Sequence, residues 1–169
     1  MPAAPGSRAD RRLRAGATPR RYRPAARAIL AGLVGSNVAL SDFHLRASIA
    51  VSDIQRAVAF YEGKLGLQAL RSGPSATIAG GSRVYGSGGG PALNVYQSVT
   101  AGKSPATMAV WYVDDIEQVV DELTAAGVEF ARYDEFDHDA KGITARAGGG
   151  RIAWFQDPDG NTFAIEADA

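Results

Sequence analysis

Apolar and polar residues follow the same order twice along this chain. A strand-like run at 47–51 leads into a helical pattern and then a second short strand-like run at 67–70. The order returns with a strand-like run at 106–113, a helical pattern, and a run at 128–130. The two helical patterns open 62 residues apart. A strand–helix–strand unit that repeats at about 60 residues predicts a duplicated architecture.

Both predicted helices have recognisable ends. Asp53 and Asp115 stand where an N-cap carboxylate accepts hydrogen bonds from the free amides of the first turn. Gln118 follows Asp115 by three residues and is positioned as its capping-box partner. Gly66 and Gly127 come after the last turns and end the helices. The apolar faces at helical spacing are Ile54, Val58, Tyr61 and Leu65, and Ile116, Val119, Val120 and Leu123.

Further strands complete each half as a βαβββ unit. Alternating runs occur at 93–96, 152–155 and 162–166, and the segment 157–161, Asp-Pro-Asp-Gly-Asn, is typical of a hairpin turn between the last two. The gaps at 72–82 and 133–149 are long. The predicted fold class is α+β: paired βαβββ modules form a curved mixed sheet around a cleft, with the helices on the outer face.

Side-chain alternation assigns a helix-facing side and a cavity side to this sheet. The helix-facing side takes Ile49, Val51, Leu93, Val95, Trp111, Val113, Phe163 and Ile165. The cavity side takes Arg46, Ser48, Asn94, Tyr96, Met108, Val110, Tyr112, Ile152, Trp154, Gln156, Thr162, Ala164 and Glu166. A wall that is partly apolar and carries a few polar groups is typical of a small-molecule site.

Composition allows one domain of ordinary globular type and restricts its chemistry. The chain has 169 residues and no cysteine, so disulfides, thiolate nucleophiles and sulfur-based metal sites are excluded. Residues 1–30 hold eight arginines and one acid, a net charge of +7, and the rest of the neutral chain therefore carries −7. An acidic body offers no basic face to a nucleic acid.

The first 42 residues are interpreted as a tail that precedes the domain. Residues 1–27 are rich in Ala, Pro, Gly and Arg and cannot bury enough apolar surface to fold. The apolar run at 28–40 is too short to span a bilayer. A disordered tail or a misplaced start is one reading; export or organelle targeting is another, and tethering to a nucleic acid or membrane surface is a third. The domain is expected over 43–169, with modules at about 43–98 and 105–167.

Several short motifs recur in order along this body. They are Val51-Ser52-Asp53, Ala59-Phe60-Tyr61, Leu65-Gly66-Leu67, Val113-Asp114-Asp115-Ile116, Ala126-Gly127-Val128 and Trp154-Phe155-Gln156-Asp157-Pro158-Asp159-Gly160-Asn161. In their order and separation the body resembles the glyoxalase/bleomycin-resistance/ring-cleaving dioxygenase superfamily, also called vicinal oxygen chelate (VOC). The resemblance covers about residues 43–167 and implies the paired βαβββ fold, with chains that often dimerise.

Metal-dependent members of the superfamily hold a divalent ion with His, Glu or Gln from four strands. The resemblance carries those four positions onto Arg46, Asn94, Met108 and Ala164. Only Asn94 is a conceivable ligand, and a weak one. Trp154 stands where ring-cleaving relatives place an acid/base tyrosine, and an indole does not transfer protons at neutral pH. We therefore expect no metal, no cofactor and no catalytic residue at the usual site.

Two histidines keep a displaced metal site open as an alternative. His44 lies two residues before Arg46 and is predicted to face the same side. His138 stands in an acidic loop beside Asp137 and Asp139, where either a metal cluster or a solvated histidine is possible.

The expected function is the binding of a small organic molecule in the cleft without a metal. Arg46 could clamp a carboxylate or phosphate, or pair internally with Glu166 or face solvent; Trp154 and Tyr96 could stack on a flat ligand or only fill the cavity. The predicted ligand-binding residues are Arg46, Asn94, Tyr96, Met108, Tyr112, Trp154 and Gln156.

Two other functions compete with metal-free binding. One is a lyase, isomerase or dioxygenase that uses a metal displaced toward His44 or His138, and the other is an accessory domain that only dimerises. We expect a cytoplasmic homodimer with a small-molecule ligand and with neither nucleic acid nor membrane as a partner.

Overall fold

The computed structural model describes residues 40–70 and 81–168. The tail predicted over 1–42 lies outside these residues except for a short 3₁₀ turn, η1 (Leu40–Asp42), and so does most of the gap predicted at 72–82. No helix of the described residues is long and apolar enough to cross a membrane.

The first half forms a four-stranded mixed sheet in the order β1-β4-β3-β2. β1 and β4 run parallel, with Ser48 beside Asn94, and the other pairs are antiparallel. A parallel pair needs a crossover, and α1 supplies it after β1. The elements are β1 (Ala47–Val51), α1 (Ile54–Tyr61), β2 (Gln68–Ala69), β3 (Ser82–Ser87) and β4 (Gly90–Gln97).

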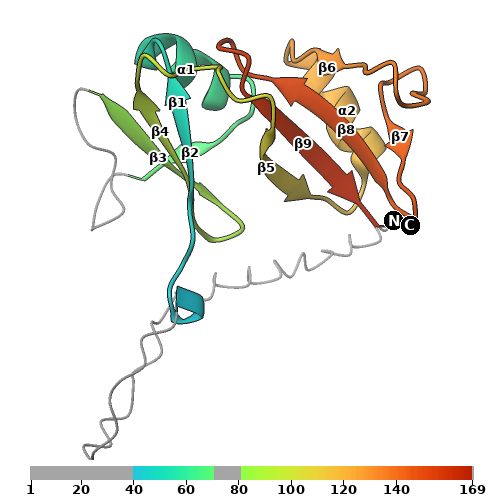
Figure 1. Ribbon diagram of the computed structural model, residues 1–169, viewed down its shortest axis with the longest axis horizontal. Helices are drawn as coiled ribbons and strands as arrows, with labels where there is room; N and C mark the ends of the chain where they lie inside the picture. The colour runs from blue at the N-terminus through green and yellow to red at the C-terminus, as the bar shows by residue number, and fades with distance from the viewer. Residues whose placement is uncertain (1–39, 71–80, 169) are drawn as a thin grey trace, which may run out of the picture. The chain divides into compact units, whose positions relative to one another are not determined.

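The second half repeats this plan in the order β5-β9-β8-β6, with β5 and β9 parallel (Figure 1). A short extra strand, β7, pairs with β8 on the same edge as β6. The elements are β5 (Thr107–Tyr112), α2 (Ile116–Ala125), β6 (Phe130–Ala131), β7 (Thr144–Ala145), β8 (Arg151–Gln156) and β9 (Thr162–Ala167).

These elements confirm the predicted α+β class and the two βαβββ modules. One detail differs: the strands form two separate sheets among the described residues rather than one continuous sheet. The physical reason is that β1 and β5 end their sheets without hydrogen bonds to each other, so the modules meet through side chains and turns.

The helix N-caps follow the sequence, but α1 ends at Tyr61 with Glu62 as its C-cap, earlier than the end predicted at Gly66. The Asp53 carboxylate accepts from the amides of Gln55 and Arg56, and the Asp115 carboxylate accepts from the amide of Gln118. The capping box predicted for Gln118 is wrong, because its side chain donates to the Glu122 carboxylate four residues on instead. Such an i, i+4 contact competes successfully with the cap on an exposed helix surface.

The helix-facing sides of both sheets share one hydrophobic core. Tyr61 of α1 stacks on Tyr85 with ring centroids 5.7 Å apart and meets Phe163 edge-on at 6.0 Å. Phe163 in turn stacks on Phe155 at 5.7 Å. Aromatic rings from both modules are therefore in direct contact, and each buried ring contributes beyond its area through these geometries.

Tyr61 makes the core sensitive to alkaline pH. Burial, and then the neighbouring Asp157 carboxylate, raise the pKa of the Tyr61 phenol far above its ordinary range. The unfolded phenol ionises near pH 10, so above about pH 10 the unfolded state binds fewer protons than the native state and stability falls. We expect a loss of about 1.4 kcal/mol per pH unit from this residue.

Urea titrations between about pH 9 and pH 11 check this expectation. The slope of the unfolding free energy against pH should become shallower in Tyr61→Phe. It should stay unchanged in Tyr112→Phe, whose ring is exposed. Equal slopes in both variants would contradict the assignment. Tyr85 adds a parallel contribution, because burial and the Glu62 carboxylate raise its pKa as well.

Candidate functional site

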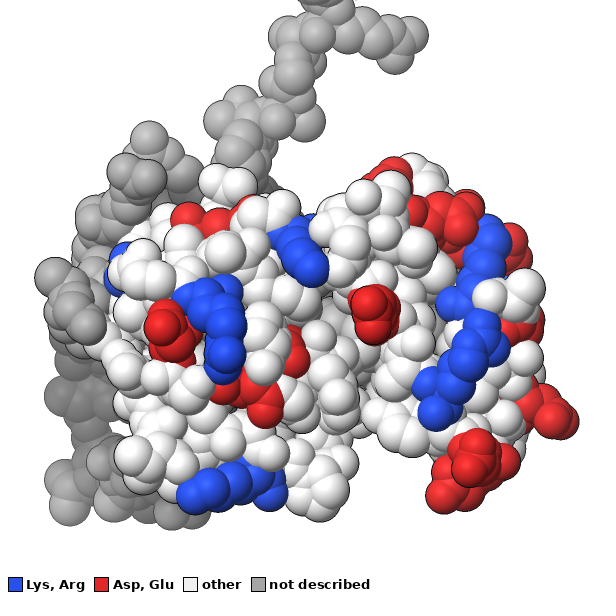
Figure 2. Space-filling view, turned by 90° about the horizontal axis from the view of Figure 1, so that it is seen from above, with Lys and Arg blue, Asp and Glu red and all other residues white. Residues whose placement is uncertain are grey.

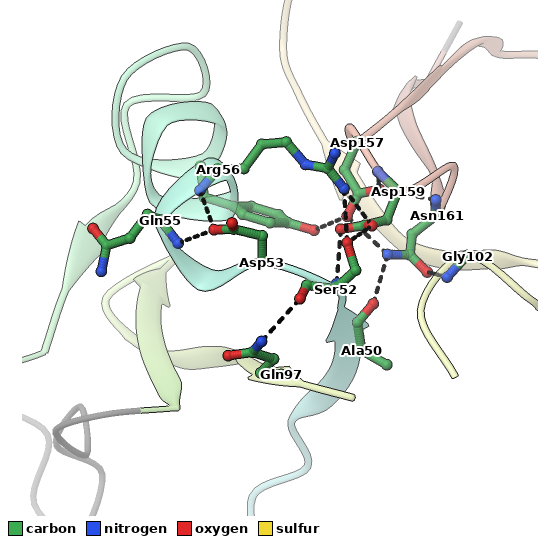
Figure 3. Close-up of polar contacts among 11 residues, drawn as sticks. Ala50, Ser52, Asp53, Gln55, Arg56, Gln97, Gly102, Asp157, Asp159 and Asn161 are labelled. Atoms are coloured by element: carbon green, nitrogen blue, oxygen red, sulfur yellow. Dashed lines mark hydrogen bonds and ion pairs between the residues drawn. The ribbon is translucent and has the colours of Figure 1, made fainter. Parts of the chain in front are cut away.

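The β8–β9 turn fastens the second module to the first (Figure 3). The Asp159 carboxylate accepts from the amide and hydroxyl of Ser52, at 3.1 and 2.6 Å, and from the Arg56 guanidinium at 2.6 Å. The Asn161 side chain donates to the Ala50 carbonyl at 2.9 Å. The Asp-Pro-Asp-Gly-Asn segment of the sequence, residues 157–161, is therefore an intermodule joint.

Asp157 is the buried centre of this joint and is 4% exposed. Its carboxylate accepts from the Tyr61 hydroxyl at 2.7 Å and from the Asn161 side chain at 2.8 Å. It also accepts from the backbone amides of Asp159 and Asn161, both at 2.9 Å. With four donors on two oxygens, the carboxylate has no capacity left for a substrate, so we assign it a structural role.

The face of the second sheet that lies away from α2, here called the open face, carries the residues predicted for the cavity side. Strand register places them in rows across neighbouring strands. One row is Tyr112, Glu166, Ile152 and Thr144, and the next is Val110, Ala164, Trp154 and Ala131.

A cavity of about 440 Å³ lies on the open face. Val110, Ile152 and Trp154 line it, and so do the charged residues Glu166 and Arg146. We call it the open-face cavity. Its complete lining is Thr107, Val110, Phe136, Thr144, Ala145, Arg146, Ala147, Ile152, Trp154 and Glu166.

Trp154 sits in an aromatic cluster rather than standing alone. The Phe136 ring stacks on it with centroids 5.2 Å apart and planes at 23°. Tyr133 and His138 contact it edge-on, at 5.6 and 6.2 Å. Phe136 is half exposed, so the ring stacked on the indole also borders solvent.

The loop that carries Phe136 is built by its own hydrogen bonds. The Tyr133 amide donates to His138 Nε2 at 3.0 Å, so the ring proton is on Nδ1, which donates to the Gly142 carbonyl at 3.1 Å. The Arg132 guanidinium donates to the Asp139 and Ala140 carbonyls, both at 2.7 Å. Because both nitrogens of His138 are engaged, this geometry favours the structural reading of that residue over metal ligation.

Glu166 is the acidic group of the open-face cavity. It is 8% exposed, and one carboxylate oxygen accepts from the half-exposed Arg146 guanidinium at 2.5 Å. Glu166 therefore pairs with Arg146 and not with Arg46, which is exposed. An ion pair at the side of an otherwise largely apolar cavity supplies both a donor and an acceptor to a ligand.

The seven predicted ligand-binding residues are not gathered in one place. Trp154 lines the open-face cavity, and Gln156 lines a different one while donating to the Thr162 hydroxyl at 3.3 Å. Tyr112 shares the open face but is 77% exposed. Arg46, Asn94 and Tyr96 belong to the first module, where Asn94 donates weakly to Ser48 at 3.5 Å.

Met108 illustrates how an irregular register changes a side chain's neighbours. The pairing of β5 with β9 shifts between Thr107 and Ala109, which leaves Met108 at a bulge. Met108 packs against the hydrophobic core, and Thr107 lines the open-face cavity.

The residues at the family's four metal positions offer little to a divalent ion. Arg46 is a cation, Ala164 is a buried methyl between Val110 and Trp154, and Met108 packs against the core. Asn94 alone has a ligand oxygen. Across residues 40–70 and 81–168, no three His, Cys, Asp or Glu side chains come together as a metal-binding group.

Sequence reasoning missed Phe136, Thr144 and Arg146 as cavity residues. All three come from the long segment at 133–149, which lacks periodicity and is one of the two long gaps between predicted elements. Its aromatic and charged residues were the available signal, since a loop of this length in a compact domain is frequently functional.

Charged side chains on the surface seen in Figure 2 are interspersed in sign, and the described residues form no broad basic patch on that face.

A second cavity, of about 210 Å³, is apolar and involves Trp111, Leu123 and Phe155 on the helix-covered side of the second sheet. It is separate from the open-face cavity, so Trp111 and Trp154 line different cavities.

Duplicated βαβββ modules, each with its helix on one sheet face, define a two-module α+β protein with a cavity on the opposite face of its second sheet. The sequence model of the Glyoxalase/Bleomycin resistance protein/Dioxygenase superfamily matches residues 43–165, and the chain belongs to this superfamily. No curated protein sequence matches the chain.

Several solved structures share the fold. One is the fosfomycin resistance protein FosX from Listeria monocytogenes, at 14% identity and a TM-score of 0.53, covering 75% of this chain and 93% of that one. An integron cassette protein from V. cholerae has 21% identity, a TM-score of 0.52 and coverage of 75% and 96%. UcmS2 has 20% identity, a TM-score of 0.52 and coverage of 73% and 98%. At these identities the likeness shows the fold alone.

Proposed function

We propose that this chain binds a small, flat, largely apolar organic molecule in the open-face cavity without a resident metal. The observation that carries the proposal is the cavity itself: four residues assigned to the cavity side by alternation, Val110, Ile152, Trp154 and Glu166, line one space of about 440 Å³. Pockets of about 300–1,000 Å³ with apolar walls and few polar groups are typical of small-molecule sites.

The donor chemistry supports binding over metal-dependent catalysis. Two of the family's ligand positions hold the guanidinium of Arg46 and the methyl of Ala164, and neither group neutralises the charge of a divalent ion. Shape and a few polar anchors are sufficient for binding, so this function survives the loss of ligands at that position.

A thermal-shift screen with flat aromatic compounds tests the proposal. We expect at least one compound to raise the melting temperature, and we expect Trp154→Ala to weaken its binding by about tenfold or more, because stacking on an aromatic ring contributes about 1–3 kcal/mol. Trp111→Phe is the matched control, since Trp111 lies at the other cavity. Equal losses in the two variants would assign the effect to stability instead.

Elemental analysis separates this proposal from the alternative of a metal-dependent lyase, isomerase or dioxygenase. We expect the purified protein to hold no stoichiometric Fe, Mn, Ni or Zn. One neighbour, a FosX variant, was solved with Mn(II) and a dihydroxypropylphosphonic acid, so Mn²⁺ with fosfomycin is an informative pair to add to the screen. Stabilisation that requires both would favour the enzyme.

We also propose that the protein works as a cytoplasmic homodimer. Large apolar side chains stand exposed near the start of β1 and on β5: Phe43 at 62%, Leu45 at 92% and Tyr112 at 77%. Large apolar side chains exposed in this way suit an interface with a second copy, and the absence of cysteine suits a reducing compartment.

The dimer prediction is tested with Leu45→Glu. Light scattering should give twice the monomer mass for the wild type, and Leu45→Glu should shift the population toward monomer. Val99→Glu is the matched control at a similarly exposed apolar residue, 89% exposed, in the turn after β4. A wild-type protein that remains monomeric at high concentration contradicts the proposal.

A further inference from the structure

We infer that the Arg146–Glu166 pair is the recognition end of the open-face cavity and selects a neutral planar ligand that presents a hydrogen-bond donor beside an acceptor, as a primary carboxamide does. The inference rests on the proposed binding function and adds the chemical class of the ligand. Neither residue belongs to the four metal positions of the family.

The first step is the state of the Glu166 carboxylate. Its side chain is 10% exposed, and Oε2 accepts from Arg146 Nη1. No residue of the described chain donates to Oε1. A carboxylate has about four acceptor positions on its two oxygens, so Glu166 keeps capacity for a donor group of a ligand inside the cavity.

The second step is the position of Arg146. Its backbone is held by a turn, because the Arg146 amide donates to the Gly150 carbonyl at 3.0 Å and the Gly149 amide donates back to the Arg146 carbonyl at 3.2 Å. Its guanidinium carries five N–H donors, and one described bond, to Glu166, uses one of them. The remaining donors can reach an acceptor atom of a ligand that lies against the pair.

The third step is the charge balance at this end. The pair is neutral as a whole. A ligand carboxylate would be attracted by Arg146 but repelled by Glu166, and a ligand ammonium group would be attracted by Glu166 but repelled by Arg146. In a cavity with largely apolar walls such repulsion is weakly screened. A neutral group with an N–H beside a C=O pairs with both residues at once, and its flat ring then lies against Trp154 and Phe136 on the cavity wall.

Four matched compounds test the inference by calorimetry on the full chain: 2-naphthamide, 2-naphthoate, protonated 2-(aminomethyl)naphthalene and 2-methylnaphthalene. We expect 2-naphthamide to bind about tenfold more tightly than the methyl compound, as hydrogen bonds to charged groups allow. Both ionic compounds should bind more weakly than the amide.

Two variants then reverse the preference. Glu166→Gln should strengthen 2-naphthoate binding by about tenfold and weaken the amide, because Arg146 is left uncompensated. Arg146→Gln should strengthen binding of the protonated 2-(aminomethyl)naphthalene by about tenfold and weaken the amide, because Glu166 is left uncompensated. Glu129→Gln is the control, since Glu129 lines a different cavity. Circular dichroism checks that each variant is folded, and the half-exposed Arg146 is the safer of the two to replace.

The outcomes separate the two proposals. Binding of all four compounds with similar affinity, or a uniform change for all of them in Glu166→Gln and Arg146→Gln, overturns the role of the pair and leaves the proposed binding function in place. Failure of all four to bind the wild type overturns the inference together with the flat aromatic ligand class. An amide preference that both variants erase supports the assignment.

Discussion

Replacing Asp157 with alanine should lower the free energy of unfolding by about 3–5 kcal/mol, the largest stability loss we expect from a polar substitution in this protein. The change leaves four donors without their acceptor: the Tyr61 hydroxyl, the Asn161 side chain and the amides of Asp159 and Asn161. The site is buried, so water does not readily replace the carboxylate.

Urea denaturation measures this loss, with Asp134→Ala as the control at an exposed carboxylate. The control should stay within about 0.5 kcal/mol of the wild type. Two unfolding transitions in Asp157→Ala would show that the joint couples the modules. A loss below about 1 kcal/mol would mean that the turn keeps its shape without the carboxylate, contrary to the role we assign it.

Gly102→Ala should destabilise the protein by about 2–4 kcal/mol. A Cβ at this position would come within 1.8 Å of the Asp159 carbonyl oxygen, and the Gly102 backbone has a φ of +65° that L residues rarely adopt. The Gly102 amide also donates to the Asn161 side chain at 3.3 Å, so displacing this segment disturbs the same joint.

The Gly66→Ala variant separates the steric cause of the expected destabilisation from the conformational cause. Gly66 has nearly the same φ, +66°, but no atom lies within 4 Å of its Cβ position. This control should lose only the conformational part, about 1 kcal/mol. Denaturation curves of the two variants, measured side by side, give the steric contribution as their difference. Equal losses would show that the segment at Gly102 moves aside freely.

Local features of the fold were predictable because their causes lie within a few residues. Asp53 and Asp115 cap their helices as expected, since a cap needs only the carboxylate and the next turn's amides. The capping box of Gln118 was wrong because its side chain turns to Glu122, four residues on, instead of back to Asp115. Local rules predict what a side chain can reach and do not decide between partners of similar strength.

The candidate site was only partly predictable. Alternation along β8 and β9 placed Trp154, Ile152 and Glu166 on one face, because a strand's side chains point alternately to its two faces. The partner of Glu166, Arg146, was not predicted because it comes from a segment without periodicity. The bulge at Met108 interrupts the alternation along β5, and nothing local to that residue marks it.

By itself, the sequence determined the duplicated βαβββ plan, the helix caps and the faces of the regular strands, because periodicity and capping act over short stretches of chain. Only the tertiary structure decided that the Asp-Pro-Asp-Gly-Asn turn joins the modules. It also decided that Arg146, Phe136 and Trp154 border one cavity. Those contacts join residues far apart in the chain or from an irregular loop, and their geometry depends on how the modules and that loop pack.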